Sequence, residues 1–282
     1  MSSSAEQSPG RVVVVTGASA GIGRAICERL AGGRYRLVLA ARSTDKLLQL
    51  EAELRQSGTE CLSVTTDVAD PNDLERLVST VVQRFSRIDV LVNNAGVDCF
   101  GEFSKLSTEQ ILQTIDINLT GTIMLTHMVV PIMLQQRSGS IINISSTAGK
   151  HGPAFGSVYG ATKAGLIGFT QGLRGELLSQ GISATAICPG FTRDGGIYDR
   201  IVAATGKRTS PLVGGTTAVA VAAAVERAIQ SGAPECIVNW PPMRPVFLLR
   251  DLFPVLGEKL ILMASRKFLK RAAAVSSEPK SP

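Results

Sequence analysis

Residues 12–23 read VVVVTGASAGIG, an apolar, β-branched run that passes directly into a glycine-rich turn. Such a run, bounded by glycine, is typical of a buried parallel strand. Glycine at the turn permits backbone angles that are closed to other residues and lets the chain come close to a ligand. A helix that begins there presents free N–H groups and a positive dipole end to phosphate. The stretch therefore predicts a strand, a phosphate-binding turn and a helix, although its spacing is G-x-x-x-G-x-G and not the commoner G-x-G-x-x-G.

Two other interpretations of this turn are open at this point. Residues 17–21, GASAG, match the G-x-S-x-G turn that carries the nucleophilic serine of α/β-hydrolases. Ser19 would then be a nucleophile, and it would need an acid and a histidine later in the chain. Such a turn would lie unusually early, on the first strand. Alternatively, the glycines only make a tight turn.

Strand-like and helix-like patterns alternate along the rest of the chain. Further apolar runs lie at 37–40, 61–64, 90–92, 141–144, 182–187 and 236–238, and charged helical patterns lie at 25–30, 45–56, 71–85, 108–135, 159–178 and 216–228. This alternation predicts parallel strands with helical crossovers. We expect a disordered start over 1–10 and then a single Rossmann-type α/β domain over 11–240, a doubly wound parallel sheet of about seven strands with helices on both faces.

Composition excludes several classes of function. Aromatic residues make up only 5% of the chain, which argues against stacking platforms for nucleic acid, and we expect no nucleic-acid partner despite the net charge of +6. Five scattered cysteines without a C-x-x-C pair, and only two histidines, argue against a disulfide framework and against a metal site. The N-terminus lacks a secretory pattern, and no run of 18 uncharged apolar residues occurs. We therefore expect a cytoplasmic protein, with a peripheral membrane contact through residues 244–271 as a further option.

Several short motifs follow the ends of the predicted strands or lie on the helices between them. They are residues 16–23 after the first strand, Asp67 and Val68 after the third, residues 93–96 (NNAG) after the fourth, Asn118 on the long helix, Ser146 after the fifth, Tyr159 and Lys163 thirteen and seventeen residues further on, and Pro189 and Gly190 after the sixth. Together, over about residues 11–240, they resemble the short-chain dehydrogenase/reductase family. The resemblance implies an oxidoreductase that interconverts a carbonyl and a secondary alcohol by hydride transfer.

The resemblance implies that Asn118, Ser146, Tyr159 and Lys163 form the catalytic set. A free tyrosine has a pKa of about 10, too high for ready ionisation at neutral pH. Lys163 lies four residues after Tyr159 on the same helix face, so we expect its charge to lower that pKa. The resemblance further implies that Lys163 binds the nicotinamide ribose, that Ser146 and Tyr159 bind the substrate oxygen, and that Asn118 holds a water. Ser145 competes with Ser146, and only one of two neighbours on a strand can face the site.

The end of the second strand indicates the cofactor. An NAD site usually presents an acid to the ribose, whereas an NADP site needs a cation for the 2′-phosphate. Here Ala41 stands where the acid would be, and Arg42 follows. We therefore expect NADP(H) and not NAD(H), although Ala20 fills a position that is often basic in relatives that use NADP. The cofactor contacts that the resemblance implies are Gly17, Ser19, Gly21, Ile22, Gly23, Arg42, Asp67, Val68, Asn94, Ala95, Gly96, Tyr159, Lys163, Pro189, Gly190 and Thr192, with Asp194 as the alternative to Thr192.

The C-terminal part departs from the family pattern. Residues 244–271 are apolar clusters with seven basic and two acidic residues, and prolines at 241, 242, 245 and 254 predict short helices at most. This extension, 241–271, is a lid over an apolar substrate pocket, a flank against a partner subunit, or an interfacial segment on anionic lipid, and we favour the lid. We expect a disordered tail over 272–282.

The partners that we expect are a small carbonyl or alcohol substrate and further copies of the chain. The resemblance implies a homodimer or homotetramer built on the helices at 108–135 and 155–178. The alternative to an enzyme is a non-catalytic protein that senses dinucleotide or acts as a scaffold on the same fold. The histidines His127 and His151 match no catalytic position of the family, so we expect structural or surface roles for them.

Overall fold

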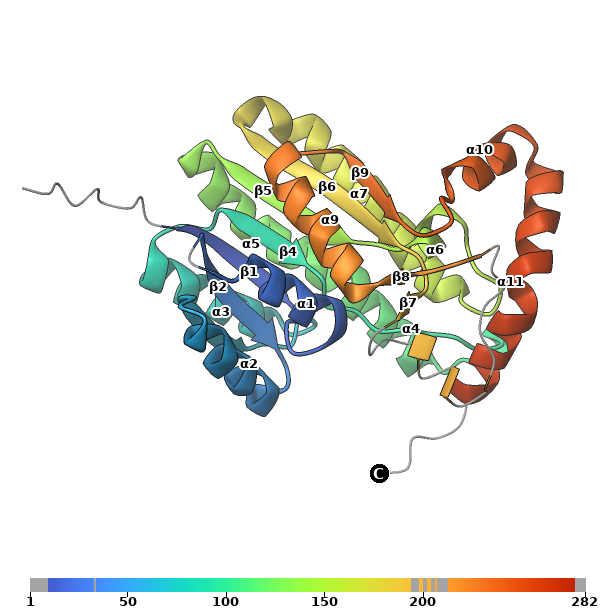
Figure 1. Ribbon diagram of the computed structural model, residues 1–282, viewed down its shortest axis with the longest axis horizontal. Helices are drawn as coiled ribbons and strands as arrows, with labels where there is room; N and C mark the ends of the chain where they lie inside the picture. The colour runs from blue at the N-terminus through green and yellow to red at the C-terminus, as the bar shows by residue number, and fades with distance from the viewer. Residues whose placement is uncertain are drawn as a thin grey trace, which may run out of the picture.

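The computed structural model describes residues 10–32, 34–193, 198–199, 202–203, 206 and 213–276 of the 282-residue chain. Its main sheet has seven parallel strands in the order β3-β2-β1-β4-β5-β6-β9, with helices on both faces (Figure 1). The prediction of a doubly wound Rossmann-type sheet is therefore confirmed. The strands are β1 (Arg11–Thr16), β2 (Tyr35–Ala41), β3 (Cys61–Thr65), β4 (Val90–Asn93), β5 (Gly139–Ile144), β6 (Ile182–Pro189) and β9 (Glu235–Val238), and the short β7 (Thr192–Arg193) and β8 (Thr216–Thr217) pair separately.

Two hydrophobic layers enclose the sheet. The α-helices are α1 (Gly21–Leu30), α2 (Thr44–Gln56), α3 (Pro71–Phe85), α4 (Thr108–Ile115), α5 (Gly121–Gln136), α6 (Thr147–Lys150), α7 (Ser157–Leu177), α9 (Ala218–Ser231), α10 (Arg244–Leu252) and α11 (Pro254–Ser276). Helices α1, α2 and α9 share one buried apolar cluster, whereas α3, α5 and the end of α7 share the other. Alternate residues of β1 divide between them, since Val13 and Val15 belong to the first cluster and Val12 and Val14 to the second.

The strand order reverses between β1 and β4. The chain moves from β1 outward to β2 and β3, then returns to pair β4 with the other side of β1. The loops that leave β1 and β4 therefore turn in opposite directions and open a crevice at the carboxyl ends of these strands. In open parallel sheets such a crevice is the usual place for a ligand. The glycine-rich turn and the NNAG motif both lie there.

The long helix predicted over 108–135 is interrupted by one wider turn. A π-helical turn, Asp116–Thr120, joins α4 to α5. By length and hydropathy alone, Thr108–Gln136 is apolar enough to cross a membrane. However, Leu125, Val129 and Met133 of α5 are fully buried in the core beside the sheet, so this segment packs as a core helix.

The C-terminal extension is more helical than the sequence predicted. Helix α11 spans 23 residues, and α10 and α11 lie beyond the sheet at one end of the molecule (Figure 1). The prediction of short helices was wrong because Pro245 and Pro254 lie in the first turns of α10 and α11, where no intrahelical N–H bond is lost. The helix also continues past the boundary expected for the disordered tail, and Ala272 and Ala273 are buried.

Candidate active site

The glycine turn after β1 is held against the turn after β4. Gly17 and Gly21 adopt φ angles of +64° and +54°, which favour glycine. A Cβ on Gly23 would lie 2.1 Å from the Gly17 carbonyl oxygen. The Asn94 amide donates to the carbonyl oxygens of Thr16 and Gly17 at 2.9 and 3.2 Å. These contacts leave room for no other residue type at Gly23 and fix the turn at the mouth of the crevice.

The N-terminus of α1 presents unpaired backbone donors. Ala20 is its N-cap, supplies no side-chain hydrogen bond, and is followed by no acidic residue in the first turn, all within residues that the structure describes. The first N–H groups of a helix lack intrahelical partners. With the positive end of the helix dipole, they form a site suited to a pyrophosphate.

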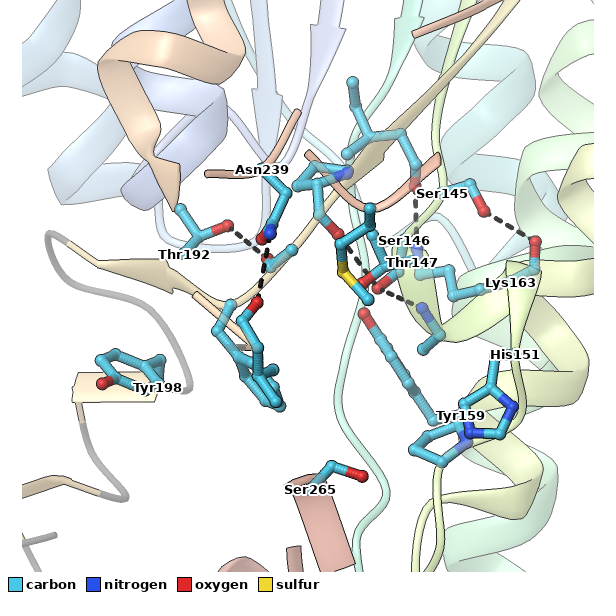
Figure 2. Close-up of a pocket in the computed structure, with 18 of the residues that line it drawn as sticks. Ser145, Ser146, Thr147, His151, Tyr159, Lys163, Thr192, Tyr198, Asn239 and Ser265 are labelled. Carbon is cyan, nitrogen blue, oxygen red and sulfur yellow. Dashed lines mark hydrogen bonds between the residues drawn. The ribbon is translucent and has the colours of Figure 1, made fainter. Parts of the chain in front are cut away.

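A cavity of about 650 Å³ opens from this turn along the carboxyl ends of the strands. Its inner wall comes from the turns after β1 and β4, from the loops after β5 and β6, and from α7. Its outer wall comes from α10 and α11, and Figure 2 shows Ser265 of α11 facing the cavity apart from Ser146 and Tyr159. The cavity therefore joins the predicted cofactor turn to the predicted catalytic residues.

Ser146 and Tyr159 meet at the end of β5. The Ser146 hydroxyl caps α6 by accepting from the Ala148 amide at 3.1 Å, and it lies 3.4 Å from the Pro189 carbonyl oxygen. The Tyr159 hydroxyl points toward Ser146 (Figure 2). Burial raises the pKa of Tyr159 to about 12, against the lowering effect of its hydrogen bond with Ser146. The phenol is therefore protonated at neutral pH.

Lys163 is buried beneath Tyr159. Its ammonium donates to the Ile144 carbonyl oxygen at 2.9 Å and lies 5.8 Å from the centre of the Tyr159 ring. Burial lowers the pKa of Lys163 to about 8. The expectation that Lys163 depresses the tyrosine pKa is wrong for this structure, because at that distance desolvation dominates the Tyr159 pKa.

The competition between the two serines is resolved by their partners. The Ser145 hydroxyl is buried and donates to the Lys163 carbonyl oxygen at 2.7 Å. Ser145 thus ties β5 to α7, whereas the hydroxyl of Ser146 faces Tyr159. This is the arrangement that strand alternation and the spacing to Tyr159 predicted.

Asn118 lies on the π turn and is fully buried. Its side chain accepts from the Val97 amide at 2.7 Å and donates to the Val97 carbonyl oxygen at 2.8 Å. A Cβ on Gly96 would lie 3.2 Å from Asn118 Oδ1 and 3.4 Å from Lys163 Nζ. Asn118 therefore clamps the loop after β4 beside Lys163, and its holding of a water stays a prediction. Wider turns of this kind often mark functional sites.

Arg42, the residue predicted to select the 2′-phosphate, lies outside the cavity together with Asp67. Arg42 follows β2, is exposed, and its guanidinium is 3.9 Å from the carboxylate of Asp67 after β3. Neither residue lines the cavity, and neither do Ser19, Gly23 or Val68. The remaining predicted cofactor contacts line it: Gly17, Gly21, Ile22, Asn94, Ala95, Gly96, Tyr159, Lys163, Pro189, Gly190 and Thr192. The Thr192 hydroxyl donates to the Gly190 carbonyl oxygen at 3.1 Å, and Asp194 lies outside the described residues.

The hydrolase interpretation of the glycine turn loses its support. It needs a histidine beside Ser19, but His127 is exposed on α5, and His151 lies in the cavity that Ser19 does not line. The side chains that face one another at this site are instead Ser146 and Tyr159 (Figure 2).

The sequence predicted a lid over an apolar pocket, but not which of its residues lie beside the catalytic side chains. Phe268, Leu269 and Ala272 of α11 are buried in a cluster with Phe100, and Tyr159 packs against it. His151, for which a structural or surface role was expected, also lines the cavity, and its buried Nε2 has no hydrogen-bond partner in the described part of the chain. Burial, followed by the charge of Arg250, lowers the pKa of His151, so the ring is neutral at physiological pH. No local pattern in the sequence marks these positions as neighbours of Tyr159.

The fold, the uncapped helix after β1 and the partly buried Ser146 and Tyr159 beside the buried Lys163 define a class of dinucleotide-dependent enzymes. Residues 11–200 match the family "short chain dehydrogenase", and the chain belongs to that family.

Three relatives illustrate the range of the match. The ketoacyl reductase HetN of Nostoc sp. is 37% identical over 235 residues, which cover 83% of this chain and 80% of that protein. The 3-oxoacyl-[acyl-carrier-protein] reductase of Synechocystis sp. is 41% identical over 64% of this chain and 74% of its own length. A crystal structure of a variant of actinorhodin polyketide ketoreductase with NADPH superposes with a TM-score of 0.75 at 34% identity, over 82% of this chain and 96% of that one.

Proposed function

We propose that this protein is an NADP(H)-dependent reductase that converts a ketone, borne on an apolar body, into a secondary alcohol. The observation that carries the proposal is the protonated Tyr159 hydroxyl, which points toward Ser146 beside the buried Lys163, in a cavity that begins at the glycine turn. The names of the ketoacyl and 3-oxoacyl relatives favour a 3-oxoacyl chain as the substrate. The apolar side chains that α10 and α11 contribute to the outer wall suit such a chain.

The cofactor fits the residues present. The α1 N-terminus offers free donors to a pyrophosphate, Gly96 leaves space beside Lys163, and Arg42 is exposed to meet a 2′-phosphate. When bound, NADPH supplies the hydride. In this proposal the Lys163 ammonium holds the ribose, and Thr192, Pro189 and Gly190 line the nicotinamide end.

Proton transfer is the part of the reaction that this chain performs. The Tyr159 hydroxyl gives its proton to the carbonyl oxygen as that oxygen gains negative charge. The Ser146 hydroxyl donates a second hydrogen bond to the same oxygen and so stabilises the charge. A phenol with a pKa of about 12 is a donor at neutral pH, which supports the reductive direction.

The experiment that tests the proposal is oxidation of NADPH by the purified protein with 3-oxoacyl thioesters of increasing chain length, beside steroid, sugar and small-ketone panels. Turnover that rises with the length of the apolar chain is expected. Tight binding of NADPH without turnover on any panel would instead favour the non-catalytic sensor or scaffold.

Cofactor preference gives a separate prediction. Ala41→Asp combined with Arg42→Gln adds a repelling charge and removes the phosphate partner. Preference for NADPH over NADH should fall by about tenfold or more, because one charge-assisted hydrogen bond contributes about 1.5–3 kcal/mol. The kcat/KM ratio for the two cofactors measures this change, and Lys46→Gln, a charge change further along on α2, is the control. A parent protein that already prefers NADH would contradict the prediction.

We also propose that the chain forms a homodimer or homotetramer through α5 and α7. Gly168, Gly172 and Gly175 on α7 are exposed, and a Cβ on any of them would meet nothing within 4 Å. Met124 and Leu134 of α5 are exposed apolar residues. We expect light scattering at micromolar concentration to give at least twice the chain mass of 29.7 kDa, and Gly172→Arg to give a monomer. A parent that scatters as a monomer contradicts this proposal.

For location we propose the cytoplasm. All five cysteines are free thiols, and four of them are buried. Reduced thiols that are widely separated are typical of a reducing compartment.

A further inference from the structure

The outer side of α10 and α11 carries an apolar patch that the proposed reaction does not use. We call Leu248, Leu252, Phe253, Val255, Leu256, Leu260 and Met263 the tip patch. Each of these side chains is at least 44% exposed, and Met263 is 80% exposed. Leu248 and Leu252 lie on α10, Phe253 joins the two helices, and the other four lie on α11. The turn between the two helices lies away from the sheet (Figure 1). Contiguous exposed apolar residues of this kind mark an interaction site.

The tip patch continues into a basic surface. Leu256, Leu260 and Met263 follow helical spacing along one stripe of α11, and the same spacing leads on to Lys267 and Lys270. Lys259, Arg266, Lys267, Lys270 and Arg271 are all exposed on this helix, which carries only one acid, Glu258. On α10, Asp251 lies 3.8 Å from Arg250, which offsets its charge. The helix thus presents apolar side chains at one end and positive charge along the rest.

We propose that the tip patch docks on the surface of an anionic lipid bilayer, with its apolar residues at the acyl boundary and its basic residues on the headgroups. An apolar stripe flanked by basic residues has the chemistry of an interfacial helix. A second copy suits the patch less well. A two-fold contact pairs the surface with itself, and the only acids that it brings to the basic residues from α10 and α11 are Asp251 and Glu258.

The patch is also continuous with the catalytic cavity. Leu260 is 44% exposed at the patch and lines the cavity on its other side. Ile261, Ala264 and Leu269 of the same helix line the cavity. Helix α11 therefore forms a wall of the cavity and, in this proposal, also docks on the bilayer. The lid and the interfacial segment, which the sequence offered as alternatives, are then two sides of the same helix.

The test is co-sedimentation of the full chain with vesicles of phosphatidylcholine alone and of phosphatidylcholine mixed with phosphatidylglycerol. We expect sedimentation with the mixed vesicles that weakens as salt increases, and little with the neutral ones. Leu252→Ser/Phe253→Ser/Leu256→Ser should lower partitioning at least about tenfold. Lys259→Gln/Lys267→Gln/Lys270→Gln should lower it by about fivefold per lysine.

The matched control, Leu48→Ser/Leu178→Ser/Val219→Ser, removes equally exposed apolar residues from other faces and should sediment like the parent. Thermal unfolding shows that each variant is folded, and Met263→Ser supplies a milder single change. Equal sedimentation of the patch variant and the parent would overturn the proposal. Failure of the parent protein to sediment with anionic vesicles would also overturn it. If, in that case, the patch variant were a monomer in light scattering and the parent a dimer, the patch would be a subunit contact.

Discussion

Replacing Tyr159 by phenylalanine should lower kcat about thousandfold, since loss of a positioned proton donor removes between about 10² and 10⁴ in rate. The substitution keeps the ring, which packs 5.8 Å from Phe100, and removes only the hydroxyl. NADPH binding, followed by fluorescence titration, should stay close to that of the parent. Turnover within tenfold of the parent would exclude Tyr159 as the acid.

Tyr35→Phe is the matched control, because Tyr35 is a buried tyrosine at the start of β2, away from the site. The pH profile adds a second readout. The pKa of Tyr159 is raised to about 12, so the phenol keeps its proton through pH 9. The pKa of Lys163 is lowered to about 8, so its ammonium is present at pH 7 and lost as pH rises through 8. We expect kcat/KM for NADPH to fall on that alkaline side, because this ratio reports groups of the free enzyme.

Moving α11 away from α10 should lower kcat/KM for long apolar substrates about hundredfold. Gly257 is buried, and a Cβ there would lie 2.3 Å from the Cα of Arg250, so Gly257→Val forces the two helices apart. The substrate then loses apolar contacts worth about 1.5–3 kcal/mol for each side chain that no longer covers it. Kinetics with short and long 3-oxoacyl thioesters measure the effect, which should be confined to the long ones.

Met263→Val is the control for this change. It introduces the same residue into the same helix at a position that is 80% exposed and does not line the cavity. An equal loss for short and long substrates in Gly257→Val would show that the helix pair supports the whole fold and does not select the substrate.

The inner part of the molecule was predictable because its signals are local. The side chains of residues 12–15 face both layers of the core, so this strand is an unbroken apolar run in the sequence. Gly17 and Gly21 have positive φ angles, and Gly23 has no room for a Cβ atom. Tyr159 and Lys163 are one helical turn apart, so their proximity follows from the period of the helix. The same reasoning could not predict that the pKa of Tyr159 is raised, because segments distant in sequence bury its hydroxyl.

A lid over the pocket was predicted, but the individual contacts of the outer wall were not predictable, for the opposite reason. Phe268 meets Phe191 with ring centres 5.2 Å apart, a contact across more than seventy residues that no periodicity reveals. Prolines were taken as breaks, whereas Pro254 begins a helix of 23 residues. His151 enters the cavity only because α10 closes beside it, where Arg250 donates to the carbonyl oxygen of Lys150.

The cavity is built from two lengths of chain that have separate tasks. Its dinucleotide end is assembled from residues 17–22 and 94–97, and most of its outer wall from residues 243–269. The family match ends at residue 200, before that wall begins. Substrate range can therefore diverge among relatives by exchange of the C-terminal segment alone, without disturbance of redox chemistry. A chimera that carries another relative's last forty or so residues should inherit that relative's selectivity and keep this chain's dinucleotide preference.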